Sequence, residues 1–217
     1  DDVYFSSVDT ANVNPTDEIY YNLTLYNFSE VPGRTARIAD VLPFPGDTYI
    51  INNVGRYTDI PAGEEFEEML FQSMYVTYRN SVTGENQDGN IENIKLYYFV
   101  EDSSSANEWR DNRAAAVATI NDFLENTKSV ANSQPVYEAW QGKWTTELPS
   151  DLSRVTAVGA EVTFKQDALL DREHALNLHI TMKTPGYTAD QIEDYAGRKM
   201  VNASVASLIR AQDDGIV

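Results

Sequence analysis

Hydrophobic and polar residues alternate along residues 18–26, which read EIYYNLTLY. Ile19, Tyr21, Leu23 and Leu25 fall on one side of an extended chain, and tyrosines and polar residues fall on the other. A two-residue period of this kind is typical of a β-strand with one buried face. We therefore expect a half-buried strand here, with a solvent-facing side that carries aromatic hydroxyls.

The same alternation of hydrophobic and polar residues recurs along the chain and predicts a protein built mainly of strands. Residues 34–42 alternate and end where two prolines remove backbone donors. Pro32-Gly33 precedes them, and a type II turn at this dipeptide, with glycine at positive φ, would join 18–26 and 34–42 as a hairpin. Further strands are expected at 69–78, 95–100, 155–164, 176–183 and 200–209.

Two segments have the residue spacing of helices instead. Val117, Ile120 and Leu124 recur at helical spacing over an alanine-rich background, which predicts a helix near residues 109–126. A short helix is expected over 188–196, because Thr188 and Gln191 have the spacing of a capping box. Gly197 suits the position that follows a helix end.

The segment around 18–48 resembles the DUF11-type immunoglobulin-like (Ig-like) repeat of Gram-positive cell-wall-anchored surface proteins. Residues 168–185 and 201–205 are similar to the last two strands of such repeats. The resemblance implies an Ig-like antiparallel β-sandwich, an extracellular cell-surface location and neighbouring domains of the same surface protein as partners. The matching residues of the first segment are Asn27, Asp40, Val41, Leu42, Pro43, Gly46 and Asp47.

We expect residues 1–217 to form a single sandwich domain with an insertion at about 101–150 that contains the helix. The sequence has no internal repeat and no Pro/Ser/Thr-rich linker. Segments that resemble the Ig-like repeat lie towards both ends of the chain. The chain begins at Asp1 without a signal segment, so we expect it to be an excised piece or a mature product.

Composition excludes several classes of function. A formal charge of −18, from 34 acidic and 16 basic residues, repels the phosphate backbones of nucleic acids and anionic membrane surfaces. We therefore expect no nucleic-acid partner. The absence of cysteine excludes disulfides, thiolate metal sites and cysteine nucleophiles. No run of about 18 apolar residues is present, so we expect no membrane insertion.

The resemblance also raises an intramolecular Lys–Asn isopeptide crosslink, a known device of Gram-positive surface domains. This crosslink needs a lysine, a facing asparagine and a buried carboxylic acid that transfers protons in apolar surroundings. Asn202 lies where the asparagine is expected, and Lys183 or Lys95 would supply the amine. Because no lysine precedes Lys95, the arrangement with lysine on the first strand is excluded. The alternative is a strand asparagine that bonds to a neighbouring turn.

A second candidate site is a calcium site in the polar loop of residues 83–93. Asp88, Asn90 and Glu92 are the candidate ligands, because Ca²⁺ prefers carboxylate and amide oxygens. The spacing does not match the twelve-residue EF-hand loop. The alternative is an acidic, solvated surface, which is expected in a chain with 34 acids.

A third candidate is a ligand-binding surface formed by Trp109, Trp140 and Trp144 in the insertion. Aromatic residues at strand spacing also pack in cores, so that alternative stays open. His174 and His179 would lie on opposite faces of one strand and cannot bind one metal together. Nucleotide-binding and serine-hydrolase motifs are absent, and we expect no enzymatic activity.

These observations favour a non-enzymatic extracellular stalk or adhesion module of a bacterial surface protein. The first alternative is an adhesin domain that recognises a host protein or a glycan through the inserted segment, because long elaborations of rigid scaffolds often carry function. The second alternative is a carbohydrate-active enzyme domain.

Overall fold

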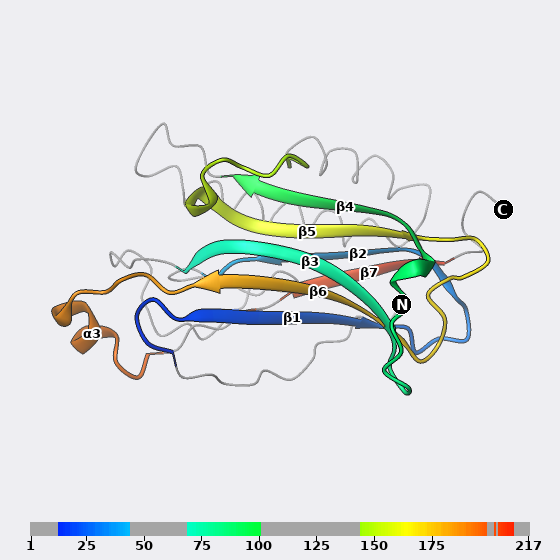
Figure 1. The fold of residues 1–217 in the computed structure, drawn as a ribbon, viewed down its shortest axis with the longest axis horizontal. Helices are drawn as coiled ribbons and strands as arrows, with labels where there is room; N and C mark the ends of the chain where they lie inside the picture. Colours follow the sequence, from blue (N-terminus) through cyan, green and yellow to red (C-terminus); the bar gives the residue numbers. More distant parts are fainter. Residues whose placement is uncertain (1–12, 44–68, 101–143, 199–201, 203, 211–217) are drawn as a thin grey trace.

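A computed structural model describes residues 13–43, 69–100, 144–198, 202 and 204–210. Within these residues, seven strands form two antiparallel sheets. The three-stranded sheet has the order β1-β6-β3 and the four-stranded sheet has the order β4-β5-β2-β7. Figure 1 shows β1, β6 and β3 side by side, with β2 and β7 behind them. The predicted mainly-β, two-sheet sandwich is therefore confirmed.

The strands are longer than the sequence pattern predicts at several ends. Their bounds are β1 Glu18–Tyr26, β2 Gly33–Val41, β3 Leu70–Asn80, β4 Ile91–Val100, β5 Val155–Phe164, β6 His174–Lys183 and β7 Ser204–Arg210. Two 3-10 turns, η1 (Asp88–Asn90) and η2 (Leu152–Arg154), precede β4 and β5. The predicted helix near 109–126 lies outside the described residues, as do the matching residues Gly46 and Asp47.

The predicted hairpin of 18–26 with 34–42 is wrong. β1 pairs with β6, whereas β2 pairs with β5 and β7 in the other sheet. The connection crosses from one sheet to the other, and the buried side chain of Asn27 stabilises it. Its Nδ2 donates to the carbonyl oxygens of Val31 at 3.0 Å and Leu170 at 2.8 Å. Each strand is visible in the local pattern, but its pairing partner is set by distant residues.

Gly33 is the first residue of β2 rather than a turn residue with positive φ, because the positive-φ glycines in the described part of the chain are Gly84 and Gly197. Glycine is needed here for space. A Cβ at Gly33 would lie 2.3 Å from Cδ1 of Leu208 on β7, far inside normal contact. Gly33 also exchanges two backbone hydrogen bonds with Leu170, of 3.0 and 2.9 Å.

The short helix α3 (Ala189–Tyr195) confirms its predicted capping. Thr188 accepts from the backbone of Gln191, and the Gln191 side chain accepts from the backbone N–H of Thr188 at 2.8 Å. Gly197 follows the helix with φ of +78°. No helix among the described residues is long and apolar enough to cross a membrane.

The core lies between the sheets and contains alternate residues of every strand. On β6 the residues Leu176, Leu178, Ile180 and Met182 are almost fully buried, which confirms the predicted alternation. The largest fully buried side chains of this core are Phe71, Tyr78, Phe164, Leu42, Leu170 and Leu176. Tyr97 is also fully buried, but on the outer side of β4.

Candidate functional site

A buried acid–amide pair joins β2 to the segment that leads into β7. Asp40 is fully buried and shares the core-facing register of Ala36 and Ile38. The Asn202 Nδ2 donates to Asp40 Oδ2 at 2.7 Å, while the Asn202 Oδ1 is buried without a hydrogen-bond partner. An isopeptide crosslink requires a lysine, an asparagine and a buried carboxyl group. Asp40 and Asn202 supply the last two of these groups.

The lysines in the described part of the chain lie elsewhere. Lys183 is on the outward side of β6, next to the buried Met182, and belongs to the other sheet. Lys95 points outward from β4, with its Nζ 3.5 Å from Glu161 Oε1. Lys165 Nζ donates to the Gly89 carbonyl oxygen at 2.7 Å. The structure therefore does not bring Lys183 or Lys95 to Asn202, and the Lys–Asn crosslink stays a prediction.

The proposed calcium ligands make internal contacts. Asp88 accepts from the Tyr78 backbone N–H at 2.6 Å and from Asn86 Nδ2 at 2.8 Å, so its carboxylate fixes the loop onto β3. Asn90 Nδ2 donates to Gln87 Oε1 at 2.8 Å.

Glu92 pairs with Arg34 at 2.8 Å, at the start of β4. The described ranges contain no group of three or more His, Asp or Glu side chains placed to hold one ion. The calcium site stays a prediction.

Of the three tryptophans in the proposed ligand surface, Trp109 and Trp140 lie outside the described residues. Trp144 is 6% exposed and its ring meets Phe99 edge-on, at 5.4 Å between centroids. The next residue, Thr145, exchanges two backbone hydrogen bonds with Tyr98 of β4, of 2.8 and 3.0 Å. Trp144 thus covers part of the outer side of β4.

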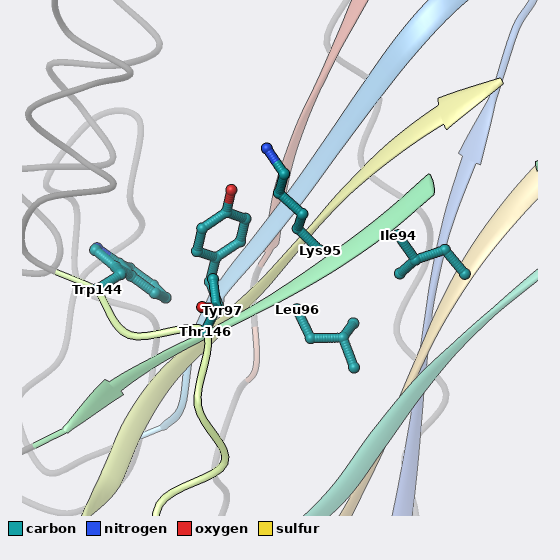
Figure 2. A pocket seen from close by; sticks show the side chains of 6 residues that line it. All are labelled: Ile94, Lys95, Leu96, Tyr97, Trp144 and Thr146. Carbon is teal, nitrogen blue, oxygen red and sulfur yellow. The ribbon is translucent and has the colours of Figure 1, made fainter. Parts of the chain in front are cut away.

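A pocket follows the edge of β4 beside Trp144. Lys95 and Tyr97 point to one side of the strand, and Ile94 and Leu96 point to the other (Figure 2). Because residues from both faces line it, the pocket is a groove along a strand edge.

The outer side of the four-stranded sheet contains a buried ion pair. Arg37 Nε lies 2.9 Å from Glu161 Oε2, and both side chains are 8% exposed. Lys95 approaches the other carboxylate oxygen of Glu161 from β4. Three strands are therefore joined by one charged row, which ties β2, β5 and β4 together.

The outer side of the three-stranded sheet is open to solvent, and we call it the tyrosine face. It consists of the outward side chains of β1, β6 and β3, which are every second residue of 18–26, 175–183 and 73–79, starting with the first. Tyr20 is 71% exposed and Tyr75 is 54% exposed. Tyr75 stacks on His179 with ring centroids 4.5 Å apart and planes 14° apart.

Two titratable groups of this face are perturbed. Burial, with the nearby Arg79 charge, lowers the pKa of His179 and favours the neutral imidazole. Its Nε2 lies 2.8 Å from Thr77 Oγ1. The Tyr20 hydroxyl donates to the Glu18 carboxylate at 2.6 Å, and this hydrogen bond raises the pKa of Tyr20.

Sequence reasoning missed the buried role of Asp40 and the tyrosine face as a site. The signal for Asp40 was its register, because an acid two residues after Ile38 falls on the same side of the strand. The tyrosine face needs the pairing of β3 with β6, and residues about 100 positions apart in the sequence form that pairing. No protein-family model, curated protein or solved structure matches the chain.

Proposed function

We propose that the chain is a non-enzymatic stalk or adhesion module of a bacterial cell-surface protein, located outside the cell and flanked by other domains. The observation that carries the proposal is the position of the first and last described strands. β1 and β7 are edge strands of opposite sheets. In a chain pulled between neighbouring domains, force would enter through these two strands.

Both strands are bonded along their length to a central strand. β1 pairs with β6 at nine consecutive positions, from Glu18 with Lys183 to Tyr26 with Ala175. β7 pairs with β2 from Ser204 with Asp40 to Arg210 with Gly33. Long antiparallel ladders over a packed core resist separation because many backbone hydrogen bonds must break together.

The strand order departs from that of a constant-type immunoglobulin domain. A constant-type immunoglobulin domain has its first strand in the four-stranded sheet and its last in the three-stranded sheet. Here β1 is in the three-stranded sheet and β7 is in the four-stranded sheet. The load-bearing geometry is unaffected, because in both arrangements the terminal strands lie in opposite sheets. Asn27 and Asp40 of the resembling segment are both buried.

Single-molecule pulling of the chain between two helical marker domains tests the proposal. We expect one unfolding event at a force well above that of the markers. The length released should be on the order of 60 nm, from about 3.5 Å for each extended residue between β1 and β7. Leu178→Ala should lower the force, and Thr181→Val, on the outer side of the same strand, should not. Unfolding at or below the marker force would contradict a stalk role.

A further inference from the structure

The tyrosine face combines exposed rings with hydrogen-bonding groups. Tyr20 and Tyr75 present their rings to solvent from the two edge strands of the sheet. Between them, the central strand β6 carries Thr181 and His179 in register with Tyr20 and Tyr75. From strand spacing and residue rise, the two rings are attached roughly 12 Å apart on a diagonal across β6.

The face is almost uncharged in a strongly acidic chain. Its outward positions contain one acid, Glu18, and two bases, Arg79 and Lys183. With His179 neutral, one negative and two positive charges give a formal charge of +1, against −18 for the whole chain. These three charged residues lie at the ends of the strands, and the Asp88 carboxylate lies at the edge of β3, where it accepts from the Tyr78 backbone N–H. Such a surface suits a ligand that is neutral and polar.

An unsatisfied amide lies at the centre of this face. Asn177 is 1% exposed, although it alternates with the core residues of β6 and so belongs to the outer side. Its Oδ1 accepts from Thr24 Oγ1 at 2.8 Å, and its Nδ2 has no hydrogen-bond partner. Because its side chain is buried, Asn177 holds Thr24 in place and is not itself accessible to a ligand.

We propose that the tyrosine face binds a neutral polysaccharide chain in an extended conformation. A sugar ring has an apolar face of C–H groups, which packs on an aromatic ring, and an edge of hydroxyl groups, which both donate and accept. Tyr20 and Tyr75 supply the rings, and Asn22 and His179 supply the polar partners. A flat sheet surface matches an extended chain rather than a single small molecule.

The arrangement disfavours other classes of ligand. The two bases lie at different ends of the face, so they do not form a cluster for phosphate or carboxylate groups. The central positions carry hydroxyl, amide and imidazole groups rather than large aliphatic side chains, which are common in the cores of protein interfaces. The proposed site does not use the segment of residues 101–150 and does not depend on the stalk role.

A depletion assay tests the proposal. The purified chain is mixed with microcrystalline cellulose, chitin and insoluble mannan, and the protein left in solution is measured. We expect retention on at least one of these polymers. Retention should persist in 1 M NaCl, because the proposed contacts are not ionic. Tyr20→Ala combined with Tyr75→Ala should weaken retention roughly tenfold through loss of ring stacking.

Matched variants separate binding from folding. Tyr75→Phe keeps the ring and should keep retention, and Tyr20→Ala removes a mostly exposed ring that cannot support the core. Ile192→Ala, at a 43% exposed position on α3, is the control for a general loss of surface apolar area. All variants should keep the parent melting temperature and unfolding force. No retention on any polymer, retention abolished by salt, or full retention by the double variant would overturn the proposal without affecting the stalk role.

Discussion

The two sheets of the sandwich share one core but differ on their outer sides. In the four-stranded sheet, β5 is buried on both faces at every position except Thr163. In the three-stranded sheet, β1 alternates between half-buried and exposed residues over most of its length. Strands buried on both faces form nearly continuous apolar runs, and strands with one wet face alternate. The outer sides, more than the shared core, distinguish the two sheets.

The polar residues of the two outer sides differ in the same way. The four-stranded sheet has a buried ion pair, Arg37 with Glu161. The three-stranded sheet has exposed tyrosines and neutral polar groups. A buried charge must be paired because desolvation is costly, whereas an exposed neutral group costs little. The outer side of the four-stranded sheet therefore stabilises the fold, whereas the outer side of the three-stranded sheet is available for binding.

The largest expected effect comes from breaking the buried ion pair. Glu161→Leu leaves the Arg37 guanidinium buried beside a side chain that cannot accept its hydrogen bond. We expect a loss of about 3–5 kcal/mol in the free energy of unfolding, as for other buried pairs that lose one partner. Urea denaturation followed by tryptophan fluorescence measures this change.

Two further variants provide the controls for Glu161→Leu. Arg37→Met combined with Glu161→Leu removes both charges and should recover much of the lost stability. Glu30→Gln breaks an exposed ion pair with Arg172 and should have no measurable effect. If Glu161→Leu were as harmless as Glu30→Gln, the outer side of the four-stranded sheet would not be structural.

The sequence predicts those parts of the fold that depend on local pattern. The alternation of 18–26 and 176–183 and the capping box at Thr188 are all confirmed. The predicted pairing of 18–26 with 34–42 was wrong, because β1 bonds to β6, some 150 residues away. Periodicity assigns each side chain to a face, but it contains no information about which strand lies beside it.

The candidate sites follow the same division. The register of Asp40 was readable, but its contact with Asn202 required the pairing of β2 with β7. Asp88 looked like a metal ligand in isolation, whereas in the fold its carboxylate accepts from the backbone of Tyr78. The use of a polar group is set by its neighbours in space, which composition and spacing along the chain do not give.

The next effect concerns the close approach of β2 and β7 within the four-stranded sheet. Gly33→Ala should cost about 1–3 kcal/mol, because its Cβ would overlap the Leu208 side chain. The cost should shrink in the Leu208→Ala background, and a double-mutant cycle measures this coupling. Gly89→Ala is the matched control, since no atom lies within 4 Å of the added Cβ. Equal costs in both backgrounds would show that space is not the reason for glycine.

The smallest effect is a change in the stabilising contribution of Tyr78 at high pH, and it tests the core side of the three-stranded sheet. Burial raises the pKa of Tyr78 to about 12, and its hydroxyl donates to the Leu169 carbonyl oxygen at 2.9 Å. Between about pH 10 and pH 12 the unfolded chain loses this proton and the folded chain keeps it. The folded state then binds more protons, so the contribution of Tyr78 to stability must fall as the pH rises through this window.

Tyr78→Phe isolates that contribution. At pH 7 the variant should be less stable by about 1 kcal/mol, the usual value of one lost hydrogen bond. Between pH 10 and pH 12 its deficit relative to the parent should narrow, because phenylalanine has no proton to lose. Tyr75→Phe, on the exposed side of the same strand, should show no such narrowing. Melting temperatures at each pH measure both differences, and a Tyr78→Phe deficit that stays constant to pH 12 would contradict the burial of an ionisable phenol on this side of β3.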